Sequence, residues 1–127
     1  MLKITFIATS VAAMQLATPN CLVGLKGKFE DPKHPDQKDP SCYFDLCVDA
    51  DDKTVTGLGT AAKYGMFSIE DGEVTKAGGF KLNVAFANGF KARASCEFET
   101  ETRCAGEWHT ESRDLDGDWF VDLQAPK

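Results

Sequence analysis

The sequence lacks the motifs that mark most catalytic and cofactor sites. It contains no phosphate-binding glycine loop, no metal-ligand spacing of cysteine and histidine, and no nucleophile signature. It also lacks any apolar run of the roughly 20 residues that a membrane-spanning helix needs. Basic residues are few, 14 against 20 acidic ones, and a formal charge of -6 repels nucleic-acid phosphates and anionic lipid. We therefore expect no cofactor, no nucleic-acid partner and no membrane partner.

The longest apolar run stands at the N-terminus. Lys3 precedes the apolar residues 4–13, and small residues follow them. This pattern predicts a secretory signal peptide over residues 1–17, cut after Ala13 or Ala17. The alternative is a strand or helix retained at the N-terminus of a cytosolic domain. If residues 1–17 are a signal peptide, we expect residues 18–127 to form one β-rich domain that is secreted and extracellular.

Cysteine is the residue type that such a small exported domain uses for covalent stabilisation. A hairpin centred on residue 100 would place Cys96 opposite Cys104, which predicts a disulfide between them. Cys21 is then expected to pair with Cys42 or Cys47, and the remaining odd thiol permits a covalent dimer if it is exposed. The alternative is that all five cysteines are reduced and buried.

Apolar residues recur with a period of two through most of the chain, which is typical of half-buried strands. The inward positions predicted for the first two strands are Val23, Leu25, Phe29, Cys42, Phe44, Leu46 and Val48. Residues 31–41 hold three prolines among charged residues and predict a surface loop, and residues 59–65 predict a short helical turn. About eight short strands indicate an all-β fold, a single-domain antiparallel β-sandwich or small β-barrel stapled by disulfides.

Three glycine-containing turns set the expected strand register. At Asn88-Gly89, a three-residue loop with a left-handed Gly89 pairs Phe86 with Phe90 and keeps every apolar residue on one face. The same loop pairs Val84 with Ala92, Leu82 with Ala94 and Phe80 with Cys96. Two-residue turns are predicted at Asp71-Gly72, setting Ile69 opposite Val74, and at Asp116-Gly117, setting Asp114 opposite Trp119.

Candidate catalytic chemistry is confined to one stretch. Period two puts Glu107, His109, Glu111 and Arg113 on one face, opposite Trp108, and carboxylates with an imidazole and a guanidinium could perform acid–base chemistry on a phosphodiester, as in small secreted ribonucleases. The simpler interpretation is that these four side chains lie on the solvent-exposed face of an antiparallel sheet.

Two other polar features have simpler interpretations. Asp114, Asp116 and Asp118 resemble the start of a calcium loop, but Gly117 is two positions too early, so a hairpin turn is favoured and no metal site is expected. His34 has no neighbour suited to acid–base chemistry and is expected to be solvated.

Over its whole length the chain resembles the small cysteine-containing proteins that filamentous fungi export, including effector-like proteins. The nearest family comparison is the Alternaria major-allergen type of β-barrel, which similarly combines an early cysteine with two later pairs. The resemblance implies a secreted β-rich protein, and it carries over no functional residue because the sequence around Cys96 and Cys104 is not shared.

These features predict a non-enzymatic, effector-like binding protein that acts outside the producing cell on a host or cell-wall protein or polysaccharide. We expect the proline-containing loop to bind this partner, because prolines reduce the entropy lost when a loop becomes ordered against a partner. The candidate binding residues are Asp31, Pro32, Lys33, His34, Pro35, Asp36, Gln37, Lys38, Asp39 and Pro40. The alternatives are a small secreted hydrolase using the Glu107–Arg113 face, and a barrel that carries a small apolar ligand in a cavity lined by Trp108, Trp119 and phenylalanines.

Overall fold

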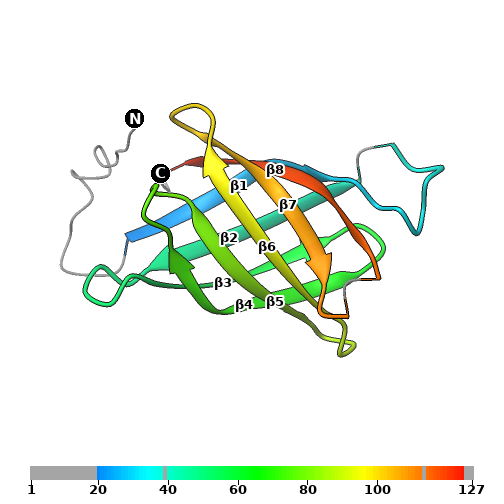
Figure 1. Cartoon of the computed structure of the whole chain (residues 1–127), viewed down its shortest axis with the longest axis horizontal. Helices are drawn as coiled ribbons and strands as arrows, with labels where there is room; N and C mark the ends of the chain where they lie inside the picture. The colour runs from blue at the N-terminus through cyan, green and yellow to red at the C-terminus, as the bar shows by residue number, and fades with distance from the viewer. Residues whose placement is uncertain (1–19, 39, 113, 125–127) are drawn as a thin grey trace.

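The computed structural model describes residues 20–38, 40–112 and 114–124, which form eight antiparallel strands in a closed barrel (Figure 1). The strands are β1 (Asn20–Phe29), β2 (Ser41–Val48), β3 (Thr54–Ala61), β4 (Gly65–Val74), β5 (Phe80–Phe86), β6 (Lys91–Phe98), β7 (Arg103–Thr110) and β8 (Asp116–Gln124). The all-β prediction is confirmed, and the fold is the barrel rather than the sandwich. In these ranges no helix is both long and apolar enough to cross a bilayer. The predicted signal peptide, residues 1–17, lies outside the described residues.

Each strand pairs with its neighbours along the chain, and β1 also pairs with β8, which closes the sheet. The connections after β1, β3, β5 and β7 therefore lie at one end, which we call the cavity end: residues 30–40, 62–64, 87–90 and 111–115. The connections after β2, β4 and β6 lie at the other end with the start of β1 and the end of β8, and we call it the disulfide end. In Figure 1 the long loop after β1, in cyan, projects at the right, at the cavity end.

The inward face of the barrel is the hydrophobic core, as the period of two predicts. Leu46, Val55, Cys104 and Val121 are the largest side chains with almost no exposed surface, and all four lie in the half toward the disulfide end. Complete burial of such a side chain contributes roughly 1.5–3 kcal/mol. The disulfide end therefore holds the most tightly enclosed part of the core.

Both predicted disulfides are present, and both lie at the disulfide end. Cys96 is bonded to Cys104, with Cα atoms 5.5 Å apart. The hairpin register differs from the expected one: Cys96 lies opposite Gly106, so the two cysteines are diagonal neighbours rather than a directly opposed pair. Cys21 is bonded to Cys47, its direct cross-strand partner, which leaves the thiol of Cys42 free.

The bulged hairpin at Asn88-Gly89 is confirmed. Phe86 N–H donates to the Phe90 carbonyl at 2.8 Å, Gly89 has φ +94°, and the three predicted strand pairs occur as expected. The predicted turn at Asp71-Gly72 is wrong, because β4 continues through these residues to Val74. Asp71 takes a left-handed φ of 49° inside a bulge, so an Asp-Gly pair here bends a strand instead of reversing it.

The predicted turn at Asp116-Gly117 is also wrong. The chain reverses earlier, over residues 111–115, and Gly117 lies opposite Trp108 within the β7–β8 ladder. The Asp114 carboxylate accepts hydrogen bonds from the hydroxyls of Thr110 and Ser112, at 2.7 and 2.6 Å, which stabilises the earlier turn. Hydroxyl and carboxylate side chains can form such a turn without glycine.

Two further expectations are corrected near the cavity end. Residues 59–65 form no helical turn: β3 runs to Ala61 and the chain reverses through Lys63, whose φ is 72°. In β1 a bulge at Lys26, φ 55°, interrupts the alternation between Gly24 and Gly27. Leu22 rather than Val23 therefore packs against the core, while Phe29 remains inward.

Candidate ligand-binding site

The barrel interior contains a cavity of about 90 Å³ in the half toward the cavity end. Its wall is apolar and includes the rings of Trp108, Trp119 and five phenylalanines. These are the residue types predicted to line the cavity of a barrel that carries an apolar ligand. The space exists because small side chains face inward: Ala92 lies opposite Val84, and Ala94 opposite Leu82. A methyl group at these positions does not reach across the barrel, so the middle remains unfilled.

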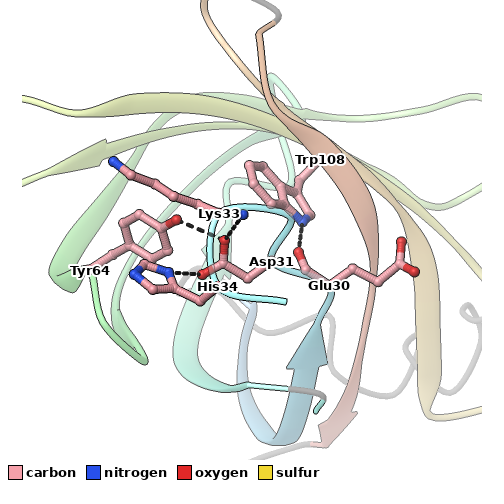
Figure 2. Close-up of polar contacts among 6 residues, drawn as sticks. All are labelled: Glu30, Asp31, Lys33, His34, Tyr64 and Trp108. Carbon is pink, nitrogen blue, oxygen red and sulfur yellow. Dashed lines mark hydrogen bonds and ion pairs between the residues drawn. The ribbon is translucent and has the colours of Figure 1, made fainter. Parts of the chain in front are cut away.

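The two indole rings that line the cavity are held by hydrogen bonds to backbone carbonyls. Trp108 Nε1 donates to the Glu30 carbonyl at 2.9 Å (Figure 2). Trp119 Nε1 is shared between the carbonyls of Ser95 and Glu107, each at 3.1 Å. The single polar atom of each indole is thus satisfied, and the rings can present apolar surface to the cavity.

A buried carboxylate, Asp31, organises the loop at the cavity end. It is the second residue of the loop after β1, and its Oδ1 accepts hydrogen bonds from the Lys33 N–H and the Tyr64 hydroxyl, both at 3.0 Å (Figure 2). Its Oδ2 lies 2.8 Å from His34 Nδ1. The expectation that His34 is simply solvated is wrong, because this ring packs between Asp31 and the Tyr64 ring.

Tyr64 connects this polar network to the cavity. Its ring lines the cavity and stacks on Phe90, with centroids 5.3 Å apart, while its hydroxyl reaches Asp31. Burial, the hydrogen bond to Asp31 and the charge of that carboxylate raise the pKa of Tyr64 to about 12. Tyr64 was not predicted from the sequence, because it lies where the chain reverses and where apolar and polar residues do not alternate.

Cys42 also faces this region. Its Sγ lies against Gly27, where an added Cβ would approach it to 2.6 Å, and the residue lines the cavity. Burial raises the pKa of the thiol to about 12, so little thiolate forms at neutral pH. A covalent dimer through Cys42 stays a prediction, and its formation requires Cys42 Sγ to move away from Gly27.

The loop predicted to bind a partner is tied down at both ends. Asp31 and Pro40 are buried, and Phe29 N–H donates to the Pro40 carbonyl at 3.0 Å. Between them, the exposed side chains are Pro32, Lys33, Pro35, Asp36 and Lys38. His34 and Gln37 are half-buried, and Asp39 lies outside the described residues. Recognition of a host or wall partner by this loop stays a prediction.

The candidate acid–base group is only partly assembled in the structure. Glu107 and His109 share the outer face of β7, with Arg93 and Asp116 opposite His109 on the two neighbouring strands. Glu111 lies past the end of β7, and Arg113 is outside the described residues. The hydrolase alternative therefore has two of its four residues on one strand.

Two carboxylates near β8, those of Asp114 and Glu30, accept hydrogen bonds from neighbouring residues. Hydrogen bonds from Ser112 and Thr110 lower the pKa of Asp114, and the Asp118 N–H donates to the Glu30 carboxylate at 2.8 Å. Within the part of the chain that the structure describes, no group of three or more acidic, histidine or cysteine side chains is placed to hold a metal ion.

The cavity and the network around Asp31 together make a site suited to binding. Two titratable side chains line the cavity, Cys42 and Tyr64, and the pKa of each is raised away from neutrality. Neither group exchanges protons readily at pH 7, as an acid–base catalyst must. Comparison of the chain with protein-family models, with curated proteins and with solved structures found no match, so its function is inferred from its own residues.

Proposed function

We propose that this protein binds a small apolar molecule inside its barrel and carries it outside the producing cell without altering it chemically. The observation that supports this proposal is the cavity of about 90 Å³ with an apolar wall. A ligand that enters such a cavity gains roughly 25 cal/mol for each Å² of apolar surface removed from water. By analogy of architecture alone, eight strands make a barrel that is either filled by side chains or holds one small ligand.

The cavity volume limits the ligand in the conformation described. An apolar protein cavity of roughly 150 Å³ accepts benzene, with six non-hydrogen atoms, so the volume of about 90 Å³ here suits a molecule of about four non-hydrogen atoms or fewer. A longer ligand requires the rings at the cavity end, Tyr64 and Phe90, to move. Their contacts with each other and with Phe86 are aromatic pairs worth about 1 kcal/mol each, which ligand binding can replace.

The extracellular part of the proposal is supported by the disulfides. Cys21–Cys47 and Cys96–Cys104 fit a protein that works in an oxidising compartment. The signal peptide predicted over residues 1–17 is consistent with export. Intact mass of the secreted protein, before and after reduction, tests both points: it should show loss of the leader and a gain of four hydrogens.

The binding proposal is tested by titration with propane, benzene and n-decane. Trp108 and Trp119 line the cavity, so bound ligand should change their fluorescence, and it should raise the melting temperature through preferential binding to the folded state. We expect propane to bind without rearrangement. The two larger molecules report how far the cavity expands.

A matched pair of variants locates the binding site. Ala94→Leu places a larger side chain in the cavity and should abolish binding. Ala85→Leu makes the same change on the outer face of the neighbouring strand, between two cavity-lining residues, and should leave binding intact. Absence of binding by all three ligands, or equal binding by wild type and Ala94→Leu, would overturn the proposal.

A further inference from the structure

Three large apolar side chains lie exposed on one outer face of the barrel. Tyr43, Leu58 and Met66 are 46%, 67% and 65% exposed, and among the side chains that the structure describes no other large apolar one is exposed to this degree. They stand on the neighbouring strands β2, β3 and β4. Tyr43 and Met66 flank Thr60 in one cross-strand row, and Leu58 is two residues before Thr60. The three side chains therefore form one contiguous surface, which we call the apolar patch.

Over residues 57–60, β3 presents its large side chain to solvent instead of to the core. Gly57 and Gly59 face the barrel interior, where a Cβ on either would collide with the backbone of β2. Leu58 lies between them, points outward and takes no part in the core. Water against such an apolar side chain is unfavourable, and a surface that covers it removes this cost. The sequence of β3 therefore favours contact on the outer face of the barrel.

Opposite charges border the apolar patch at its two ends. Lys63 is exposed in the reversal between β3 and β4, at the cavity end. Glu70 is exposed on β4 toward the disulfide end, two positions beyond Ser68. The inward-facing Phe67 lies between these charges, four residues after Lys63 and three residues before Glu70. The patch therefore has a positive border and a negative border at similar distances from its middle.

A face with this charge pattern is self-complementary under a two-fold rotation. When two copies stack face to face, the axis lies between them and runs either along the strands or across them. An axis along the strands places Lys63 over Lys63 of the second copy, which is repulsive. An axis across the strands, over the row that contains Phe67, places Lys63 of each copy over Glu70 of the other. It also places Asp45, which hydrogen-bonds Tyr43 of its own chain, over Tyr43 of the second copy. The charges thus favour antiparallel strands.

The size of the face sets the expected strength of association. Three strands about 4.8 Å apart and about 26 Å long cover roughly 400 Å² in projection. Stable complexes bury roughly 800 Å² on each partner, so this face is too small for a permanent interface. We expect a reversible association with a dissociation constant on the order of 100 µM.

We propose that the apolar patch binds a second copy of this chain, giving a symmetric and reversible dimer with antiparallel strands. Leu58 and Met66 are covered at the centre, and two Lys63–Glu70 ion pairs form at the edges. The cavity ends of the two copies then point in opposite directions. The dimer goes beyond the proposed function, and because its side chains lie on the outer face, it can fail without affecting the cavity proposal.

The first test is sedimentation equilibrium of the protein at low salt, between about 10 µM and about 1 mM, which brackets the expected constant tenfold on each side. The average mass should rise from that of a monomer toward that of a dimer. Leu58→Thr keeps a residue that suits a strand and removes the central apolar contact, so it should weaken association at least about tenfold. Its melting temperature should stay close to that of the wild type, because Leu58 is exposed. A monomer throughout this range overturns the proposal, and so does undiminished association of Leu58→Thr.

Charge reversals test the antiparallel arrangement. Lys63→Glu and Glu70→Lys each replace two attractive pairs with two repulsive ones, so each variant alone should associate about tenfold more weakly. An equimolar mixture of the two variants restores both attractive pairs and should associate about as tightly as the wild type. The double variant Lys63→Glu/Glu70→Lys should also recover the wild-type dissociation constant. If the single variants associate as tightly as the wild type, the two charges do not face each other and the arrangement is wrong.

The matched controls are Lys91→Glu and Glu97→Lys. Lys91 and Glu97 are exposed at the cavity end and the disulfide end of β6, outside the apolar patch. These substitutions change the net charge by the same amounts as those at Lys63 and Glu70, and they should leave the dissociation constant unchanged. If they weaken association as much as the patch variants do, net charge rather than the proposed pairing controls association, and the proposed interface is wrong.

Discussion

The two ends of the barrel differ in how their interiors are filled. At the disulfide end, Leu46, Val55 and Val121 are almost completely buried, and two covalent bonds join neighbouring strands. At the cavity end, alanines leave an empty volume, and the closing contacts are hydrogen bonds and aromatic pairs around Tyr64. The tightest packing and both disulfides are thus at one end, and the cavity proposed to bind a ligand is toward the other.

The free-energy cost of the cavity can be compared with the stabilisation from the disulfides. An unfilled cavity costs roughly 24 cal/mol per Å³, so a volume of about 90 Å³ lowers the free energy of unfolding by about 2 kcal/mol. Each disulfide restricts the unfolded chain by an amount of similar or larger size. Covalent bonds at one end can therefore offset the packing that is missing at the other.

The largest expected effect compares a leucine at the disulfide end with a leucine that lies near the middle of β5 and lines the cavity. Leu46 and Leu82 are 1% and 3% exposed, but Leu82 lines the cavity and Leu46 does not. Leu46→Ala should cost about 4 kcal/mol, and Leu82→Ala nearer 2–3 kcal/mol, because a side chain beside an existing void has fewer contacts to lose. Denaturant unfolding of both variants measures the difference.

The denaturation curves should keep the wild-type slope, so that the midpoints report stability alone. Equal losses for the two leucines would contradict the proposed difference in packing between the disulfide end and the cavity wall.

The next largest effect comes from the disulfides. Cys21–Cys47 joins residues 26 apart in sequence and Cys96–Cys104 residues 8 apart. The loop-closure entropy of the unfolded chain predicts losses of about 3.5 and 2.5 kcal/mol when each pair is replaced by alanines. Ligand affinity should change little in either double variant that remains folded, since the cavity is at the other end. A large loss of affinity without unfolding would show that the ends are coupled.

The elements that sequence reasoning predicted correctly are those in which local chemistry and apolar register agree. Around Gly89, one loop length puts the large apolar residues of β5 and β6 inward, and the structure has that loop. The disulfide between Cys96 and Cys104 was predicted correctly although the expected register was wrong, because diagonal as well as directly opposed cysteines come within bonding distance.

The failures come from local signals that have two structural meanings. Asp71-Gly72 has the composition of a hairpin turn, yet its left-handed Asp71 forms a bulge, and only pairing with distant strands decides between the two. The indoles and phenylalanines that line the cavity were predicted, but the hydrogen bond between Asp31 and Tyr64 beside it was not. Asp31 and Tyr64 are 33 residues apart, and barrel closure alone brings them within hydrogen-bond distance.

A smaller effect tests the hairpin at the cavity end. Gly89 has φ +94°, and an added Cβ would meet no other atom within 4 Å, so a substitution there is penalised through the backbone rather than by a clash. Gly89→Val should cost about 1–2 kcal/mol, because a β-branched residue strongly disfavours this conformation. Ala87→Val, at an exposed position in the same turn, is the control and should cost much less. A loss below about 1 kcal/mol at Gly89 would contradict the bulged turn.

The smallest expected effect concerns the contact that closes the cavity end. The pKa of Tyr64 is about 12 in the folded protein and about 10 in the unfolded chain, so its contribution to the free energy of unfolding is complete below pH 10 and is lost as the pH rises through 12. With solvent screening, we expect a loss of about 1 kcal/mol between these values, absent in Tyr64→Phe. In Tyr43→Phe, Tyr64 is the remaining tyrosine, and its ultraviolet absorbance should show ionisation near pH 12. Ionisation near pH 10 would mean that the Tyr64–Asp31 contact is open in solution, and that the cavity end is held less firmly than the structure indicates.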